Sequence, residues 1–228
     1  EAGGHDNTLV IFTSDNGPER FMHLRKKEIG HFSAAQFRGC KRDNWDGGHR
    51  VPLIAQWPTR IPAGARSAQV VSLVDFFATA AAIVGAHYPD EAGEDSFDIL
   101  PAMLGESGTR LIRECTIHHS ASGCFAIRKG EWKLLIHQGS GGNSYDEFRD
   151  MSPVQLYRII EDEHEDRNLC EDRPDIVLEL AEDFLRILDK GRSTPGQEQQ
   201  NYGEDNRWVQ VRSALQSLSQ MGITVSGG

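Results

Sequence analysis

The chain has 228 residues, with 24 basic against 34 acidic side chains and a formal net charge of -10. Nucleic acid and anionic membranes are disfavoured as main partners, because both are themselves negatively charged. Any anionic substrate must be held by local positive charge. Length and apolar content allow a buried core in one large or two small domains.

The most apolar stretch, residues 70–86, contains Asp75 and is shorter than the ~20 residues that a membrane span requires. We interpret it as a buried helix. The first residues contain no Met and show no signal-peptide pattern before an apolar strand begins. We therefore expect this chain to be a piece of a longer protein.

Apolar runs in the first half predict an α/β layer. Residues 8–14, TLVIFTS, are apolar and largely β-branched up to Thr13, which predicts a strand covered on both faces in a parallel sheet. Residues 51–57, VPLIAQW, predict a second such strand. A helix is predicted around residues 74–85, between two loops marked by Gly and Pro.

The second half changes to short runs. CTIHHS, CFAIRKG, EWKLLIH and LYRII are separated by turn signals, which predicts an antiparallel meander. A helix is predicted from Asp172, with Pro174 in its first turn, to Gly191. The cysteines at 40, 115, 124 and 170 lack zinc spacing, and a hairpin turning near 121–123 would keep Cys115 from Cys124, so free thiols are expected.

Asp15-Asn16-Gly17 directly follows the first predicted strand. On local pattern alone this is an ordinary turn signal. The alternative is a ligand site, because a carboxylate and an amide carbonyl supply the oxygens that calcium prefers, and α/β proteins bind ligands where parallel strands end. The local sequence leaves both interpretations open.

A second group of motifs occupies residues 37–58, FRGCKRDNWDGGHRVPLIAQWP. A lysine in such a loop is normally a solvated charge, but a desolvated Lys41 would be a strong point charge for an oxyanion. Gly47 and Gly48 would allow close backbone approach. The loop could be braced by pairing among three side chains, Asp46, His49 and Arg50.

The order of these motifs resembles the formylglycine-dependent sulfatases of the alkaline phosphatase superfamily. That family has a strand ending in Ser-Asp-Asn-Gly, then Gly-x-Lys, then Trp/Tyr-Glu/Asp-Gly-Gly-x-Arg-Val-Pro, and a strand ending in Trp-Pro. The corresponding residues here are 14–17, 39–41, 45–52 and 57–58. The likeness continues to about residue 196, through VQLYRIIEDEHEDRNL and RSTPG.

The resemblance implies an α/β fold of the alkaline phosphatase type, with part of a mixed or parallel sheet and flanking helices. A small α+β subdomain with an antiparallel sheet and one packed helix would follow. We assign residues 1–112 to the C-terminal part of the catalytic domain, 113–196 to the subdomain and 197–228 to a polar tail. Periplasmic location or secretion is expected from the family.

The resemblance also implies roles for single residues. Asp15 and Asn16 match two of the family's calcium ligands, and Lys41 matches the lysine that contacts the sulfate group. His118 or His119, on a predicted strand, could face the substrate. Bracing is the role expected of the loop residues Asp46, Gly47, Gly48, His49 and Arg50.

Part of the family pattern is absent from the chain. The pentapeptide Cys-x-Pro/Ala-Ser-Arg, or its serine form, whose first residue is oxidised to formylglycine, does not occur. The upstream Asp pair that completes the calcium site is also missing. In the family these elements precede the Asp-Asn-Gly strand, so we expect truncation and no activity from the isolated fragment.

The resemblance implies a sulfuric ester hydrolase, with calcium and formylglycine as cofactors, that acts on a sulfated sugar or an aryl sulfate. One alternative is a phosphate or phosphonate ester hydrolase of the same superfamily, although the lysine motif and the Gly-Gly-x-Arg-Val-Pro motif argue against it. Another is a non-catalytic protein that binds sulfated glycans. The upstream sequence would distinguish the enzyme from the binding protein.

Overall fold

A computed structural model describes residues 4–106, 108, 110–142, 144, 152–201 and 207–223. The chain forms two compact units, each taken by itself. The first unit comprises Glu1–Ser14, Pro52–Thr116 and Lys190–Gln200. The second unit comprises Asp15–Val51, Ile117–Asp189 and Asn201–Gly228.

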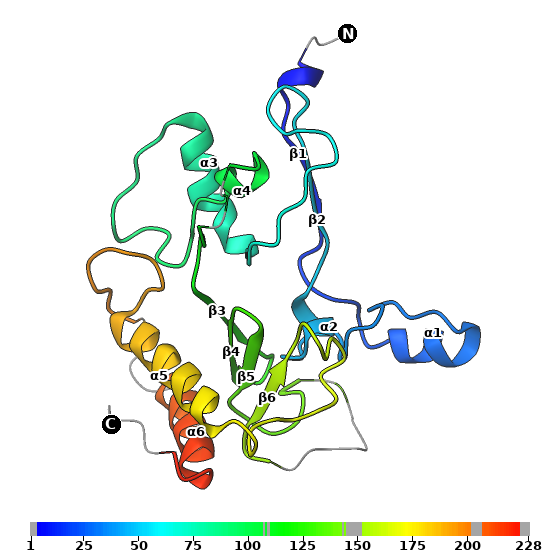
Figure 1. Ribbon diagram of the computed structural model, residues 1–228, viewed down its shortest axis with the longest axis vertical. Helices are drawn as coiled ribbons and strands as arrows, with labels where there is room; N and C mark the ends of the chain where they lie inside the picture. Colours follow the sequence, from blue (N-terminus) through cyan, green and yellow to red (C-terminus); the bar gives the residue numbers. More distant parts are fainter. Residues whose placement is uncertain are drawn as a thin grey trace. The chain divides into compact units, whose positions relative to one another are not determined.

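Figure 1 shows the helices and strands in chain order. Those of the first unit are η1 (His5–Asn7), β1 (Val10–Thr13), β2 (Leu53–Gln56), η2 (Leu73–Asp75), α3 (Phe76–Val84) and α4 (Leu100–Met103). Those mostly or wholly in the second unit are α1 (Met22–Ile29), α2 (Asp46–His49), β3 (Cys115–His119), β4 (Phe125–Lys129), β5 (Trp132–Leu135), β6 (Gln155–Arg158), α5 (Pro174–Lys190) and α6 (Arg207–Gln220).

Strands β1 and β2 pair antiparallel, as a two-stranded sheet. The prediction of parallel strands covered on both faces is therefore wrong for this chain, and Phe12 and Ile54 are 63% and 60% exposed. The reason lies in the chain between the strands. Gly17 N donates to Gly48 O at 2.9 Å, so this segment returns to its starting point and β2 runs back along β1.

The helix predicted after β2 is present as η2 and α3. It begins with a capping box, in which Ser72 N donates to Asp75 Oδ2 at 2.7 Å. Its burial is less complete than predicted. Ala78 is buried, whereas Phe77 and Val84 are 47% and 74% exposed, so only one face of the helix is covered.

The predicted meander is confirmed as a four-stranded sheet in the order β3-β4-β5-β6. Pairs β4–β5 and β5–β6 are antiparallel. Helix α5 lies against this sheet, with the rings of Phe125 and Phe184 5.0 Å apart. Its buried residues recur at helical spacing and are Val177, Leu180, Ala181, Phe184, Leu185 and Ile187.

Helix α6 lies where a polar tail was predicted. It buries Val211, Ala214 and Leu218, which recur every three or four residues. All four cysteines are free, as predicted. None of the helices in the described ranges combines the length and the apolar character needed to cross a membrane.

Candidate functional site

The two sequence motifs lie side by side in the second unit. Residues 38–50, here called the lysine loop, contact the segment that follows β1 through backbone hydrogen bonds. Gly17 N donates to Gly48 O at 2.9 Å, and Lys41 N donates to Pro18 O at 2.8 Å. The structure therefore brings the backbone of Lys41 next to the Asp15-Asn16-Gly17 turn.

Three glycines make this contact possible. A Cβ added to Gly17 would lie 1.8 Å from Gly47 O, and one added to Gly47 would lie 2.4 Å from Arg38 O. A Cβ on Gly48 would lie 2.2 Å from Asp43 O. Each distance is far below van der Waals contact, so a side chain at any of these three positions would require the backbone to shift.

Asp15 and Asn16 have side chains suited to a hard cation. Asp15 is exposed and Asn16 is half-buried. Asn16 Nδ2 donates to Gly17 O at 3.0 Å, which commits the amide nitrogen to the backbone and makes the carbonyl oxygen the metal-binding atom of that side chain. The two donors fit calcium chemically, but calcium takes about 6–8 oxygens and needs ligands beyond this pair.

No group of three or more His, Cys, Asp or Glu side chains in the described ranges could hold a metal ion. Asp15 and Asn16 are thus a partial calcium site at most within those ranges. The assignment of both residues as ligands stays a prediction.

Lys41 is half-buried and lies beside one carboxylate. The pKa of Glu19 is lowered by a hydrogen bond from Arg20 N and by the nearby charges of Arg42 and Lys41. Arg42 Nη1 lies 2.9 Å from Glu19 Oε1. Two cations, Lys41 and Arg42, therefore lie near Glu19 at this end of the lysine loop.

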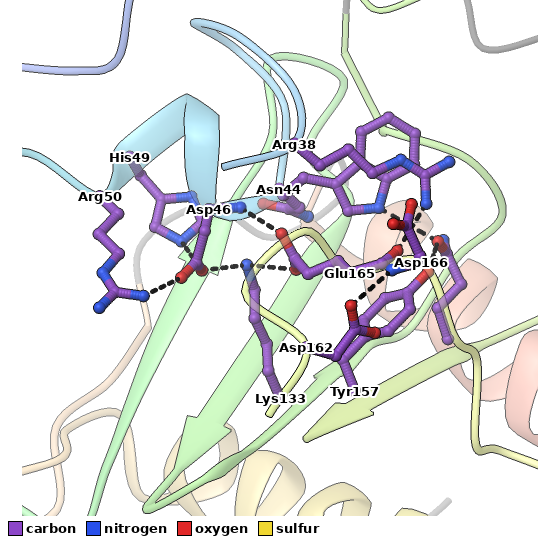
Figure 2. A network of polar contacts seen from close by, with 12 residues as sticks. Arg38, Asn44, Asp46, His49, Arg50, Lys133, Tyr157, Asp162, Glu165 and Asp166 are labelled. Atoms are coloured by element: carbon purple, nitrogen blue, oxygen red, sulfur yellow. Dashed lines mark hydrogen bonds and ion pairs between the residues drawn. The ribbon is translucent and has the colours of Figure 1, made fainter. Parts of the chain in front are cut away.

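A buried ion network holds the other end of the lysine loop (Figure 2). Lys133 Nζ lies 2.7 Å from Asp46 Oδ1 and 2.9 Å from Glu165 Oε1, and none of the three side chains is more than 3% exposed. Asp46 N donates to Glu165 Oε2 at 2.6 Å. These three residues, here called the ion network, fasten α2 to strand β5 and to the loop after β6.

Asp46 also lies close to two basic side chains of its own loop. His49 Nε2 lies 3.6 Å and Arg50 Nη1 3.2 Å from its carboxylate. Burial alone would raise the pKa of Asp46, but the charges of Lys133, His49 and Arg50 bring it well below its ordinary value. Burial raises the pKa of Glu165, which Lys133 offsets only in part, so Glu165 takes up a proton before Asp46 as pH falls.

The two histidines proposed to face substrate differ in their surroundings. His118 stacks on His49, with ring centroids 4.0 Å apart, and so packs against the lysine loop. His119 is exposed, and its Nδ1 lies 3.1 Å from Ser120 O. A substrate-facing role for either stays a prediction.

Sequence reasoning missed Lys133 and Glu165. Lys133 stands within an otherwise apolar strand, WKLL, and a lysine in such a run signals a buried charge with a partner. Its partners, Asp46 and Glu165, lie 87 positions before and 32 positions after it in the chain. No local sequence pattern could therefore identify them.

Known proteins match this chain over much of its length. A family model described as Sulfatase matches residues 1–86. The chain is 32% identical over 189 residues to the N-acetylgalactosamine-6-O-sulfatase of Bacteroides thetaiotaomicron, covering 78% of this chain and 35% of that protein. It is 36% identical over 144 residues to the N-acetylgalactosamine-6-sulfatase of Canis lupus familiaris, covering 63% of this chain and 26% of that protein. It thus spans between 26% and 35% of the length of these two relatives.

Solved structures give the same result. A Bacteroides thetaiotaomicron protein from work on glycosaminoglycan metabolism matches with a TM-score of 0.68 and 29% identity, covering 80% of this chain and 39% of that one. The phosphonate monoester hydrolase of Agrobacterium radiobacter matches with a TM-score of 0.54 and 22% identity, covering 82% of this chain and 36% of that one. At this identity the match shows the fold alone. The fold is the mixed α/β fold of the alkaline phosphatase type that was predicted. The motifs and these matches together show that the chain belongs to the sulfatase family.

Proposed function

We propose that the protein is a sulfatase that hydrolyses the sulfate ester of a sulfated sugar. The observation that carries the proposal is the glycine-mediated contact between the Asp15-Asn16-Gly17 turn and the lysine loop. This contact holds two hard oxygen donors and one ammonium on neighbouring stretches of backbone. Relatives named for N-acetylgalactosamine 6-sulfate match 78% and 63% of this chain, against 46% and 54% for an arylsulfatase and a steryl-sulfatase, and this larger coverage supports a sulfated sugar.

In this proposal Lys41 binds the sulfate group. Its ammonium is half-buried, so its charge is less screened by water than that of an exposed lysine. A fixed positive charge stabilises the sulfuryl oxygens most where negative charge develops on them, which is in the transition state. Lys41 therefore contributes to turnover more than to folding.

Asp15 and Asn16 would hold calcium, together with ligands from outside this pair. Bound calcium would offset the negative charge of the sulfate group, and a formylglycine formed from a Cys or Ser outside this chain would supply the nucleophile. The residues of this chain bind and orient the sulfate. The ion network and the glycine contacts keep Lys41 and Asn16 from moving apart.

The native protein should be assayed on an N-acetylgalactosamine 6-sulfate substrate, a chromogenic aryl sulfate and the matching aryl phosphate. We expect turnover of the sulfate esters well above that of the phosphate, and the highest kcat/KM for the sugar. Preference for the phosphate or a phosphonate would favour the phosphoester hydrolase alternative. Binding of the sulfated sugar without turnover would favour the non-catalytic glycan-binding protein.

Two further expectations belong to the same proposal. The 228-residue chain assayed alone should show no turnover, since it lacks the formylglycine pentapeptide. Calcium-dependent hydrolysis by this chain would contradict the assignment of the nucleophile. Periplasmic location or secretion is proposed on the family resemblance, and fractionation of the source cells tests it.

A further inference from the structure

A cavity of about 530 Å³ lies within the second unit, next to the lysine loop. This volume is in the range of small-ligand pockets, roughly 300–1,000 Å³. Gly39 lines it, two positions before Lys41, whereas Asp15, Asn16 and Lys41 do not. The cavity is therefore adjacent to the proposed sulfate site and separate from it.

Helix α1 supplies one wall of the cavity. His23 and Lys26, one turn apart, both line it. The helix buries none of its residues, so core packing does not explain why this basic face points toward the cavity. Lys26 Nζ also lies 4.8 Å from the ring centroid of Phe32, a lining residue that is 55% exposed.

Arg38, the first residue of the lysine loop, supplies a second cation to the lining of the cavity. Its guanidinium lies 3.8 Å from the ring centroid of Trp45, and Nη1 donates to Glu165 O at 2.7 Å. These contacts fix the plane of the group before any ligand arrives. A planar, oriented guanidinium suits carboxylate and sulfate groups, which accept two parallel hydrogen bonds.

The charges around the cavity favour an anion, although the chain as a whole carries -10. Lys26 and Arg38 face a single lining carboxylate, Asp166, which pairs with His164 at 2.8 Å. Phe32 and Phe37 offer apolar ring surface beside these cations. Cations combined with aromatic faces suit a ligand with both an acidic group and an apolar ring face, and a uronic acid or sulfated sugar has both.

We propose that this cavity is a subsite for a second anionic sugar unit of a sulfated glycan, one that adjoins the sugar whose sulfate ester is cleaved. The inference rests on the proposed function and extends it from the sulfated sugar to the glycan chain that carries this sugar. Lys26 binds the acidic group of that second unit, Arg38 orients it, and Phe32 packs against the sugar ring.

The test compares a substrate that is too small to enter the cavity with one that is long enough to do so. The native protein and its Lys26→Ala and Lys26→Glu variants are assayed on a small chromogenic aryl sulfate and on a sulfated glycosaminoglycan oligosaccharide. Lys27→Ala is the matched control, since this exposed lysine on the same helix does not line the cavity. We expect KM for the oligosaccharide to rise about tenfold in Lys26→Ala and further in Lys26→Glu. The kcat for the oligosaccharide, and both kcat and KM for the aryl sulfate, should stay unchanged.

A binding titration separates failure of the subsite from failure of the proposed function. The oligosaccharide is titrated by calorimetry into the native protein and the same variants, and this measurement needs no turnover. Weaker binding in Lys26→Glu but not in Lys27→Ala supports the subsite even if no sulfate is released. Unchanged binding and KM in the Lys26 variants would overturn it, as would equal affinity for an oligosaccharide whose second unit carries no acidic group.

Discussion

Lys133 Nζ lies 2.7 Å from Asp46 Oδ1, with both side chains buried. The same ammonium lies 2.9 Å from Glu165, so one cation serves two buried carboxylates. Buried charges are stable only while they are paired. The meander in the second half of the chain thereby holds the lysine loop, which the first half supplies.

Replacing this cation should destabilise the protein strongly. Lys133→Met keeps the length of the side chain but leaves two carboxylates without their shared partner, which should lower the free energy of unfolding by about 3–5 kcal/mol. Lys129→Met, on the neighbouring strand β4, is the control. Lys129 is 33% exposed, and its partners Glu179 and Asp183 are 52% and 15% exposed. Water screens these pairs more than those of Lys133, and we expect a loss of about 0–1 kcal/mol.

Urea unfolding of the two variants measures the difference. Adding Glu165→Gln to Lys133→Met should recover part of the loss, because one of the two uncompensated carboxylates is then neutral. Equal, small losses in Lys133→Met and Lys129→Met would show that the ion network contributes little.

Stability should fall below neutral pH because of His137. Its Nδ1 donates to Gln138 O at 3.0 Å, and its Nε2 lies 2.9 Å from Asn44 Nδ2, an arrangement that requires a neutral ring. Burial lowers the pKa of His137 from its ordinary value of 6.5. Below that value the unfolded chain takes up a proton that the folded chain does not, so stability present above pH 6.5 is lost as pH falls.

One such group changes the free energy of unfolding by up to about 1.4 kcal/mol per pH unit. Urea midpoints at pH 7.5 and pH 5 should therefore differ more in the wild type than in His137→Gln. Burial also lowers the pKa of His49, so some slope should persist in the variant. The same slope in both proteins would contradict the assignment to His137.

Gly17→Ala tests the contact between the turn and the lysine loop. The added Cβ would overlap the backbone at Gly47 O, and we expect a loss of about 3 kcal/mol or more in the free energy of unfolding. Gly4→Ala is the control, because its Cβ would meet only Thr8 Oγ1 at an ordinary 3.7 Å. Thermal unfolding of both variants gives the comparison, and a Gly17→Ala protein of wild-type stability would exclude the close approach.

Calcium dependence should respond to Asp15. Chelation should abolish sulfatase activity of the native protein, and added calcium should restore it. In Asp15→Ala the calcium concentration for half-maximal activity should rise about tenfold or more, because a charged ligand is lost. Asp189→Ala, at an exposed acid on α5, is the control. An unchanged calcium requirement in Asp15→Ala would remove this residue from the metal site.

Local patterns were sufficient to predict the meander and helix α5. These features depend on neighbours in sequence or on turn signals, which a single chain displays. The spacing of Val211, Ala214 and Leu218 also carried the signal for α6, but the surrounding polar residues obscured it.

Other features depend on contacts that no local pattern contains. The apolar run of β1 indicated a strand but not its partner, and the antiparallel pairing with β2 follows from where the chain returns at Gly48. Lys133 indicated a buried charge without identifying Glu165 as its partner. The cavity beside Gly39 combines α1 with residues more than 100 positions later, such as Tyr157.

The proposed contact between Lys41 and the sulfate group is tested by kcat of Lys41→Ala in the native protein on a sulfated sugar. We expect kcat to fall about 100-fold or more, because a preorganised charge on the developing oxyanion is lost. The urea midpoint should remain that of the wild type, and Lys27→Ala should change neither quantity. Wild-type kcat in Lys41→Ala, or a loss of activity that only follows a loss of folded protein, would contradict this role of Lys41.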